Sequence, residues 1–306
     1  MKSMPNFLDW SINCQSLNRN KPMNKSILLN NGTRIPQIGF GTYQLPGNEV
    51  IEPLKSALAL GYQMIDTATV YRNEQEIGDT LKELGNSKVY ITSKLAPSDQ
   101  GYEAALNAVQ QSVKKLGRVN MYIIHWPGSK GLDPKSPLNK ERRMESWRAL
   151  EEAVQSGIVE SIGVSNYTLA HMKELLAECK IMPAMLQIEL HPLYYPKQLI
   201  QFCQEHNIAI EAYSSLGRGN LLSDEYKDKY PALKTAEQNS GRKLSQVLLR
   251  WQLDKNWIVI PKSSNPKRIK ENCDLDFVLS QSDSESLDAI SDTTQEKFCW
   301  DPETIV

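Results

Sequence analysis

The chain has 306 residues, with 35 Lys and Arg against 36 Asp and Glu and a formal net charge of −1. This balance excludes the basic excess typical of nucleic-acid-binding proteins, and 40% hydrophobic residues exclude wholesale disorder. No apolar run reaches the ~18–20 residues that a membrane-spanning helix needs. Five cysteines without a C-x-x-C pair indicate neither a disulfide framework nor a metal site, so we expect a cytoplasmic protein without a bound metal.

Residues 1–25 precede the region in which we expect the fold to begin. They contain four basic residues against one acid, Asp9, and lack the apolar stretch of a secretory signal. We expect a flexible extension over 1–25 and a single domain over 26–306. This domain begins with a predicted β-hairpin, because strand-like residues flank Asn31-Gly32, a typical hairpin turn.

Eight short apolar or β-branched runs follow along the chain. They predict strands over 36–41, 63–67, 88–93, 120–125, 158–164, 185–190, 208–213 and 256–260. Amphipathic helical patterns separate these runs; one of them spans Leu106 to Leu116 at spacings of three and four residues and stops at Gly117. Similar patterns stop at Gly85 and at Gly157.

Two helix starts carry recognisable capping residues. Asn73 with Glu76 three residues later resembles a capping box, in which the Asn side chain bonds to the backbone of the first turn. Asn265-Pro266 is typical of an N-cap followed by the first helical residue.

Eight strands that alternate with helices predict a closed (β/α)8 TIM barrel. The alternative, an open doubly wound sheet, would carry G-x-G-x-x-G after its first strand, whereas residues 39–44 read GFGTYQ and lack the third glycine. We therefore predict an α/β barrel with the N-terminal hairpin as a plug at its bottom and an extended C-terminal tail. The acidic, Ser- and Thr-rich residues 280–294 predict a solvated helix followed by a loop, and Phe298 and Trp300 are the only expected anchors of the tail.

Polar residues collect where the predicted strands end. In a barrel these ends meet at one face, which carries the active site. Asp66, Tyr71, Lys94 and His125 follow or end three successive strands and are the candidate catalytic residues. A phenol has a pKa of ~10, and a neighbouring ammonium such as that of Lys94 would lower it.

Asp66 would hold Lys94 in place, and His125 would bond to the same substrate oxygen as the phenol. This set suits protonation of a carbonyl oxygen while a hydride reaches the carbon. It equally suits an aldolase in which Lys94 forms a Schiff base, and the spacing alone does not choose between the two reactions.

Several motifs resemble the aldo-keto reductase superfamily. They are GFGTY at 39–43, IDTA at 65–68, YRNE at 71–74, TSKL at 92–95, HWP at 125–127, IGVSN at 162–166, QIELHP at 187–192, AYSSLG at 212–217 and IPKS at 260–263. The match extends in order over roughly residues 26–300. The resemblance implies a barrel without a Rossmann domain that reduces aldehydes or ketones with NADPH, with Tyr71 as the general acid.

The resemblance also implies a cofactor site. Tyr213 would stack on the nicotinamide, Ser165, Asn166 and Gln187 would bond its carboxamide, and Lys262, Ser263 and Arg268 would hold the 2′-phosphate. The remaining implied contacts to the cofactor are Gly41, Thr42, Asp66, Ser214, Leu216, Gly217, Glu271 and Asn272. Two cations and a hydroxyl near a helix start favour NADPH over NADH on physical grounds as well.

The substrate is expected to be a small carbonyl compound. Tyr43, His125, Trp126 and Trp300 would line its pocket. The resemblance implies that the loops 127–139 and 217–230 and the C-terminal tail form its walls. The alternative is a non-catalytic nucleotide-binding protein, regulatory or structural, on the same fold. Because no heptad or exposed apolar stripe is present, we expect a monomer with no nucleic-acid or membrane partner.

Overall fold

The structure is a computed structural model that describes residues 25–306; most of the predicted extension lies outside the described residues. Eight parallel strands form one sheet in which neighbours follow chain order. The strands are β3 (Phe40–Gly41), β4 (Met64–Asp66), β5 (Tyr90–Leu95), β6 (Met121–Ile124), β7 (Ser161–Ser165), β8 (Met185–Glu189), β9 (Ala209–Tyr213) and β10 (Ile258–Val259). A bridge from Ile38 to Val259 joins the two outer strands, and the predicted (β/α)8 barrel is confirmed.

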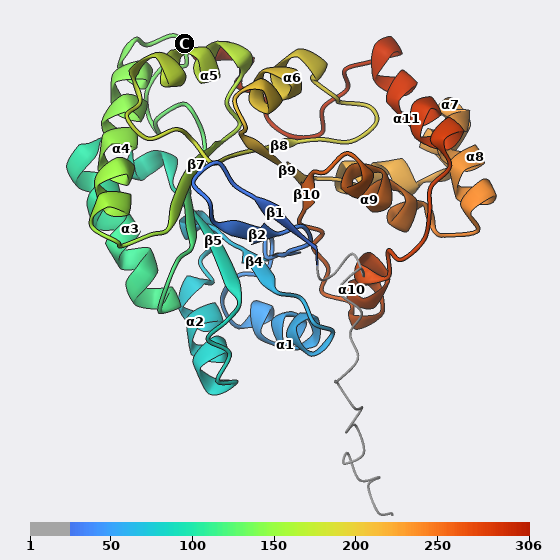
Figure 1. Ribbon diagram of the computed structural model, residues 1–306, viewed down its shortest axis with the longest axis horizontal. Helices are drawn as coiled ribbons and strands as arrows, with labels where there is room; N and C mark the ends of the chain where they lie inside the picture. Colours follow the sequence, from blue (N-terminus) through green and yellow to red (C-terminus); the bar gives the residue numbers. More distant parts are fainter. Residues whose placement is uncertain (1–24) are drawn as a thin grey trace, which may run out of the picture.

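Helices surround the strands (Figure 1). They are α1 (Ile51–Ala59), α2 (Glu74–Glu83), α3 (Tyr102–Leu116), α4 (Leu138–Gln155), α5 (Leu169–Glu178), α6 (Lys197–Glu205), α7 (Asp224–Lys229), α8 (Pro231–Ser240), α9 (Leu244–Asp254), α10 (Pro266–Cys273) and α11 (Gln281–Thr293). In the predicted apolar stripe of α3, Val109 and Leu116 are buried and Leu106 and Val113 are half-buried against the core. The helix ends at Gly117 with φ of 80°, a left-handed conformation that favours glycine. No helix in the described part of the chain is long and apolar enough to cross a membrane.

The predicted N-terminal hairpin is present as β1 (Ser26–Leu28) and β2 (Arg34–Pro36) and lies across the barrel in Figure 1. Its buried residues Ile27, Leu29 and Ile35 belong to one apolar cluster with residues of the barrel strands and their flanks. The partners in this apolar cluster are Met64, Tyr90, Met121, Ile123, Ala184, Met185, Ile258 and Ile260. The amino-terminal end of the barrel is therefore closed by packed apolar side chains.

The seam between β3 and β10 requires a small residue at Gly41. A Cβ atom there would lie 2.5 Å from the carbonyl oxygen of Ile260, far inside van der Waals contact. The Gly41 N–H donates to the Pro261 carbonyl at 3.2 Å. Gly41, implied above to touch the cofactor, thus has a structural reason to be glycine.

Two predictions of local structure are wrong. The Asn73 side chain does not cap α2; its amide donates to the carbonyls of Thr42 and Leu45, and its oxygen accepts from Thr67. The predicted loop 217–230 is largely helical, with a 3₁₀ turn followed by α7. By contrast, Asn265 caps α10 as predicted, accepting from the first backbone N–H groups of the helix.

The C-terminal region also differs from its prediction. Helix α11 is not simply solvated, because Leu287 and Ile290 are buried and the helix packs on α8. Trp300 is 81% exposed and does not anchor the tail, whereas Phe298 does pack against the barrel core. Hydrogen bonds to backbone atoms hold the rest of the tail; in one of them the Arg143 guanidinium donates to the Val306 carbonyl at 2.7 Å.

Candidate active site

A buried ion pair lies at the carboxyl end of the barrel. The Lys94 ammonium on β5 donates to both carboxylate oxygens of Asp66 on β4 at 2.7 Å and to the Thr67 carbonyl at 2.8 Å. Lys94 is fully buried and Asp66 is 2% exposed. The three ammonium protons are all used, so Lys94 is held as a fixed cation.

Tyr71 and His125 lie beside this ion pair, as predicted. Tyr71 ends a 3₁₀ turn after β4, and its ring centroid is 5.2 Å from the Lys94 Nζ. The His125 ring stands nearly perpendicular to the Tyr71 ring, with centroids 5.8 Å apart. The structure therefore brings all four candidate catalytic residues together.

The pKa of Tyr71 is not lowered overall, contrary to what the neighbouring ammonium of Lys94 led us to expect. Burial, and then the nearby carboxylate of Asp66, raise the pKa of Tyr71 well above its usual value. Burial disfavours the charged phenolate, and the Asp66 carboxylate paired with Lys94 adds to this effect. Burial and Lys94 lower the pKa of His125 well below its usual value, so both groups are neutral at pH 7.

Gln187 and Glu211 extend the polar cluster across β8 and β9. The Gln187 Nε2 donates to Asp66 Oδ2 at 2.9 Å and also to Glu211 Oε1. Glu211 is fully buried, and its other oxygen, Oε2, has no hydrogen-bond partner among the described residues. Burial, and then Asp66, raise the pKa of Glu211 to about 8.

Glu211 was missed by the sequence reasoning, although a signal was available. It is the one acid in the otherwise apolar strand run 208–213, and it alternates with Ala209 and Tyr213 on the face that points into the barrel. An acid at an inward position of a central strand is rare unless it is paired or functional.

The ends of β7 and β9 meet through Asn166 and Tyr213. The Tyr213 hydroxyl donates to Asn166 Oδ1 at 2.6 Å, and the Asn166 amide donates to the His125 carbonyl and to Ser165 Oγ. Asn166 and Ser214 have positive φ angles of 63° and 50°, which are uncommon for residues other than glycine. Such local strain is typical of binding and catalytic sites.

The loop after β9 is braced by the C-terminal tail. Gly217 has φ of 56°, and a Cβ atom there would lie 2.8 Å from Leu221 and from the Phe298 ring. The Ser214 Oγ lies 3.4 Å from the Cys299 Sγ, while Leu216 is half-buried. These implied cofactor residues lie together along one loop.

Glu189, at the end of β8, holds the tail over this loop. Its carboxylate accepts from the backbone N–H groups of Phe298 at 2.6 Å and Cys299 at 3.2 Å, and it contacts His191 at 3.1 Å. The side chains of Glu189 and His191 are both fully buried. In the sequence analysis Glu189 appears only within the motif QIELHP, and it has no assigned role there.

A basic pair lies at the start of α10. Lys262 and Arg268 are exposed, and neither forms an ion pair within residues 25–306. Burial, and then the positive charge of Arg268, lower the pKa of Lys262. Arg268 Nε donates to Ser263 Oγ at 3.2 Å.

The other implied cofactor residues are engaged within the protein. Glu271 pairs with Lys243 at 2.5 Å, and Asn272 is buried in α10. Thr42 is fully buried, and both its N–H and its hydroxyl donate to the Asp66 carbonyl. Thr42 thereby ties β3 to β4 directly below the catalytic cluster.

Aromatic rings border the cluster on its solvent side. The ring centroids of Tyr43 and Tyr71 are 5.2 Å apart, and those of Trp126 and Trp300 are 6.1 Å apart. Tyr43 is 51% exposed, so these side chains present apolar surface to solvent next to the polar cluster. All four predicted substrate-pocket residues therefore take part in aromatic contacts: Tyr43 and His125 each contact Tyr71, and Trp126 contacts Trp300.

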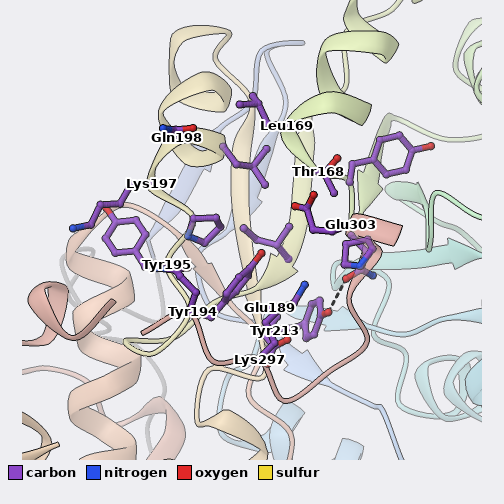
Figure 2. Close-up of a pocket in the computed structure, with 17 residues that line it drawn as sticks. Thr168, Leu169, Glu189, Tyr194, Tyr195, Lys197, Gln198, Tyr213, Lys297 and Glu303 are labelled. Carbon is purple, nitrogen blue, oxygen red and sulfur yellow. Dashed lines mark hydrogen bonds between the residues drawn. The ribbon is translucent and has the colours of Figure 1, made fainter. Parts of the chain in front are cut away.

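A cavity of about 320 Å³ opens beside Tyr213 (Figure 2). It is bordered by the ends of β7 to β9, the starts of α5 and α6, and the tail; its labelled lining includes Glu189, Tyr194 and Lys297. None of the four candidate catalytic residues lines it.

Comparisons with known proteins support a common ancestry for this arrangement. A family model described as the aldo/keto reductase family matches residues 37–292. Glyoxal reductase of Bacillus subtilis (strain 168) is 38% identical over 272 residues, covering 87% of this chain and 92% of that protein. The crystal structure of an aldo/keto reductase from Brucella melitensis has 39% identity and a TM-score of 0.78, covering 87% of this chain and 99% of that chain.

A variant of Gox0644, crystallised in complex with NADPH, is also similar. It has 34% identity and a TM-score of 0.81, and the match covers 92% of this chain and 98% of that chain. Because the family model and these relatives span most of the chain, the protein belongs to the aldo/keto reductase family of oxidoreductases.

Proposed function

We propose that the protein reduces aldehydes and ketones to alcohols with NADPH, and that Tyr71 is the general acid. One observation carries the proposal: a neutral phenol, a neutral imidazole and a buried Lys94–Asp66 ion pair converge at the carboxyl end of a family-typical barrel. Carbonyl reduction needs a proton donor at the oxygen and a hydride donor at the carbon, and this cluster supplies the first.

The residues of the chain act on the substrate oxygen. When bound, the reduced nicotinamide supplies the hydride. As the carbonyl bonding pair moves onto oxygen, Tyr71 transfers its proton there, and His125 donates a hydrogen bond to the same atom. The pKa of Tyr71 keeps the phenol protonated before the reaction. The phenolate that remains is stabilised by the Lys94 ammonium until it regains a proton from solvent.

The cofactor residues present in the chain fit NADPH. Lys262 and Arg268 are cations without acidic partners among the described residues, as a 2′-phosphate site requires. The Tyr213 hydroxyl is held by Asn166, and the side chain lines the cavity at this end of the barrel, which supports stacking on the nicotinamide as its role. The Gln187 Oε1 accepts no hydrogen bond from any described residue and suits the carboxamide N–H groups.

The arrangement argues against a Schiff-base aldolase. Such an enzyme needs a lysine that loses its proton and reaches the substrate. Lys94 is fully buried, and its three protons are donated to Asp66 and Thr67. Its role is that of a fixed charge.

The proposal predicts NADPH consumption with a panel of carbonyl compounds, including glyoxal, methylglyoxal and aromatic aldehydes. Arg268→Leu is expected to raise the KM for NADPH ~10-fold or more, because a charged hydrogen bond is lost, while leaving the KM for NADH unchanged. Arg242→Leu is the matched control, since Arg242 pairs with Asp274 outside the proposed phosphate site.

Two results would contradict the proposal. NADPH binding without turnover of any carbonyl compound would favour the alternative, a non-catalytic nucleotide-binding protein. An equal loss of NADPH affinity in Arg242→Leu would remove the basis for the phosphate site.

A further inference from the structure

Glu211 is a buried acid that the proposed reaction does not use. It lies in the middle of β9, fully buried, and pairs in register with Gln187 on β8 and Ile258 on β10. A carboxyl group in such a position destabilises the fold unless it forms hydrogen bonds. Its one hydrogen-bond partner in the described chain is the Gln187 amide. The function of Glu211 must therefore be sought at Gln187.

The contacts of Gln187 determine which way its amide points. The atom that contacts Glu211 also lies 2.9 Å from Asp66 Oδ2. Both Asp66 oxygens already accept from the Lys94 ammonium, so Asp66 is ionised and can only accept. The shared atom must be the Gln187 nitrogen, and its two protons go to the two acids. Only Oε1, an acceptor, remains for a ligand.

We propose that Glu211 is a positioning residue that, with Asp66, fixes the Gln187 amide so that Oε1 selects the N–H side of the cofactor carboxamide. This inference rests on the proposed function. The nicotinamide carboxamide has an N–H₂ end and a C=O end, and an acceptor favours the first and repels the second. Because the carboxamide is attached to the ring, this choice also favours one face of the ring toward the substrate.

Of the two acids that hold Gln187, only Glu211 can be replaced without disturbing the candidate catalytic residues directly. Asp66 also holds Lys94, so its replacement would disturb catalysis directly. Glu211 contacts no candidate catalytic side chain except through Gln187. The raised pKa of Glu211 indicates a neutral carboxyl group, whose carbonyl oxygen accepts from Gln187. A glutamine at this position keeps that acceptor, whereas a methionine of similar length removes it.

The test measures dissociation constants with tryptophan fluorescence for NADPH and for its 3-acetylpyridine analogue, in which an acetyl group replaces the carboxamide and no N–H is present. We expect the wild type to bind NADPH ~10-fold more tightly than the analogue. Glu211→Met is expected to reduce this ratio to ~3-fold or less, because the Gln187 amide can turn. Glu211→Gln is expected to keep the wild-type ratio.

Binding of 2′,5′-ADP, which lacks the nicotinamide, monitors the fold and the phosphate site in each variant and is expected to be unchanged. If Glu211→Met fails this control, Glu211→Leu takes its place. The inference would be overturned, without affecting the proposed function, by either of two results. One is that the apolar variant keeps the wild-type ratio of the two dissociation constants; the other is that Glu211→Gln lowers this ratio as much as the apolar variant does. Failure of the wild type to bind NADPH would overturn the proposed function and this inference with it.

Discussion

The two ends of the barrel are built from opposite kinds of side chain. The amino-terminal end is closed by the hairpin, where Ile27, Leu29 and Ile35 pack against methionines and isoleucines of the strands. The carboxyl-terminal end buries polar groups: the ion pair of Asp66 and Lys94, the Gln187 amide and the Glu211 carboxyl group. Eight parallel strands run from one environment to the other.

This difference indicates that one end of the barrel serves mainly stability and the other mainly chemistry. Burial of apolar area stabilises the fold by roughly 25 cal/mol per Å², so the plug contributes favourably wherever it fits. Burial of charged groups is costly even when they are paired, and a hydrophobic replacement of the whole pair is often neutral or stabilising. The polar cluster is therefore expected to be maintained by function, and the plug by folding.

The largest effect is expected at the buried ion pair. Lys94→Met leaves the Asp66 carboxylate without a cation, which should lower the free energy of unfolding by about 3–5 kcal/mol and abolish carbonyl reduction. Urea unfolding and NADPH oxidation measure the two effects. Lys55→Met is the control, because Lys55 pairs with Glu83 at 3.2 Å on the surface and should contribute less than ~1 kcal/mol. Equal effects of the two substitutions would refute the contrast between buried and exposed pairs.

The second prediction concerns the opposite end of the barrel. Ile35 is fully buried in the plug, so Ile35→Ala should lower the free energy of unfolding by about 2–4 kcal/mol by leaving a cavity. The turnover rate per folded molecule should stay within twofold of the wild type, as judged from assays well below the midpoint of thermal unfolding. A large loss of turnover in fully folded protein would break the proposed division between the two ends.

A pH dependence of stability is expected from Glu211. Its pKa is about 8 in the folded protein and ~4.5 in the unfolded chain, so the folded state holds a proton that the unfolded state releases. Wild-type stability should thus fall as the pH rises from ~5 to ~8, and Glu211→Gln should remove this decline. The stability of the variant relative to wild type should increase by about 1–3 kcal/mol over that range.

Urea unfolding at several pH values measures this linkage. Parallel stability profiles of the two proteins would show that Glu211 is ionised in the folded state, contrary to its burial beside Asp66.

The smallest effect is expected at the exposed rim. Trp300 contacts Trp126 but is 81% exposed, so Trp300→Ala should raise the KM for aromatic aldehydes about 3–5-fold. The dissociation constant of NADPH and the free energy of unfolding should not change. A loss of stability above ~1 kcal/mol would instead make Trp300 an anchor of the tail, as the sequence first suggested.

Much of the fold was predictable because the chain repeats a simple pattern. Apolar runs and helical stripes located all eight barrel strands, and Asn31-Gly32 located the hairpin. Asn73 was misassigned because a capping pattern specifies only local spacing, while the side chain bonds to loop carbonyls around residues 42–45. Trp300 was misassigned because hydrophobicity does not show which side of a tail faces the protein.

The residues of the candidate site could be predicted from the sequence, but the pKa values of their side chains could not. Strand ends and family motifs identified Tyr71 and Lys94. The pKa of the phenol, however, depends on how deeply Tyr71 is buried and on its proximity to Asp66, which are three-dimensional properties. Glu211 was missed because only residues at the ends of the predicted strands were considered, and Glu211 lies in the middle of one. Alternation of inward positions would have revealed it.

The most direct test of the account is single-turnover hydride transfer in Tyr71→Phe, followed by the loss of NADPH absorbance with an active aldehyde in excess. This substitution removes only the phenolic oxygen. The account predicts a rate at least ~100-fold below wild type, with NADPH affinity and the free energy of unfolding essentially unchanged. A rate close to that of the wild type would contradict the assignment of Tyr71 as the proton donor, and with it the functional reading of the polar end of the barrel.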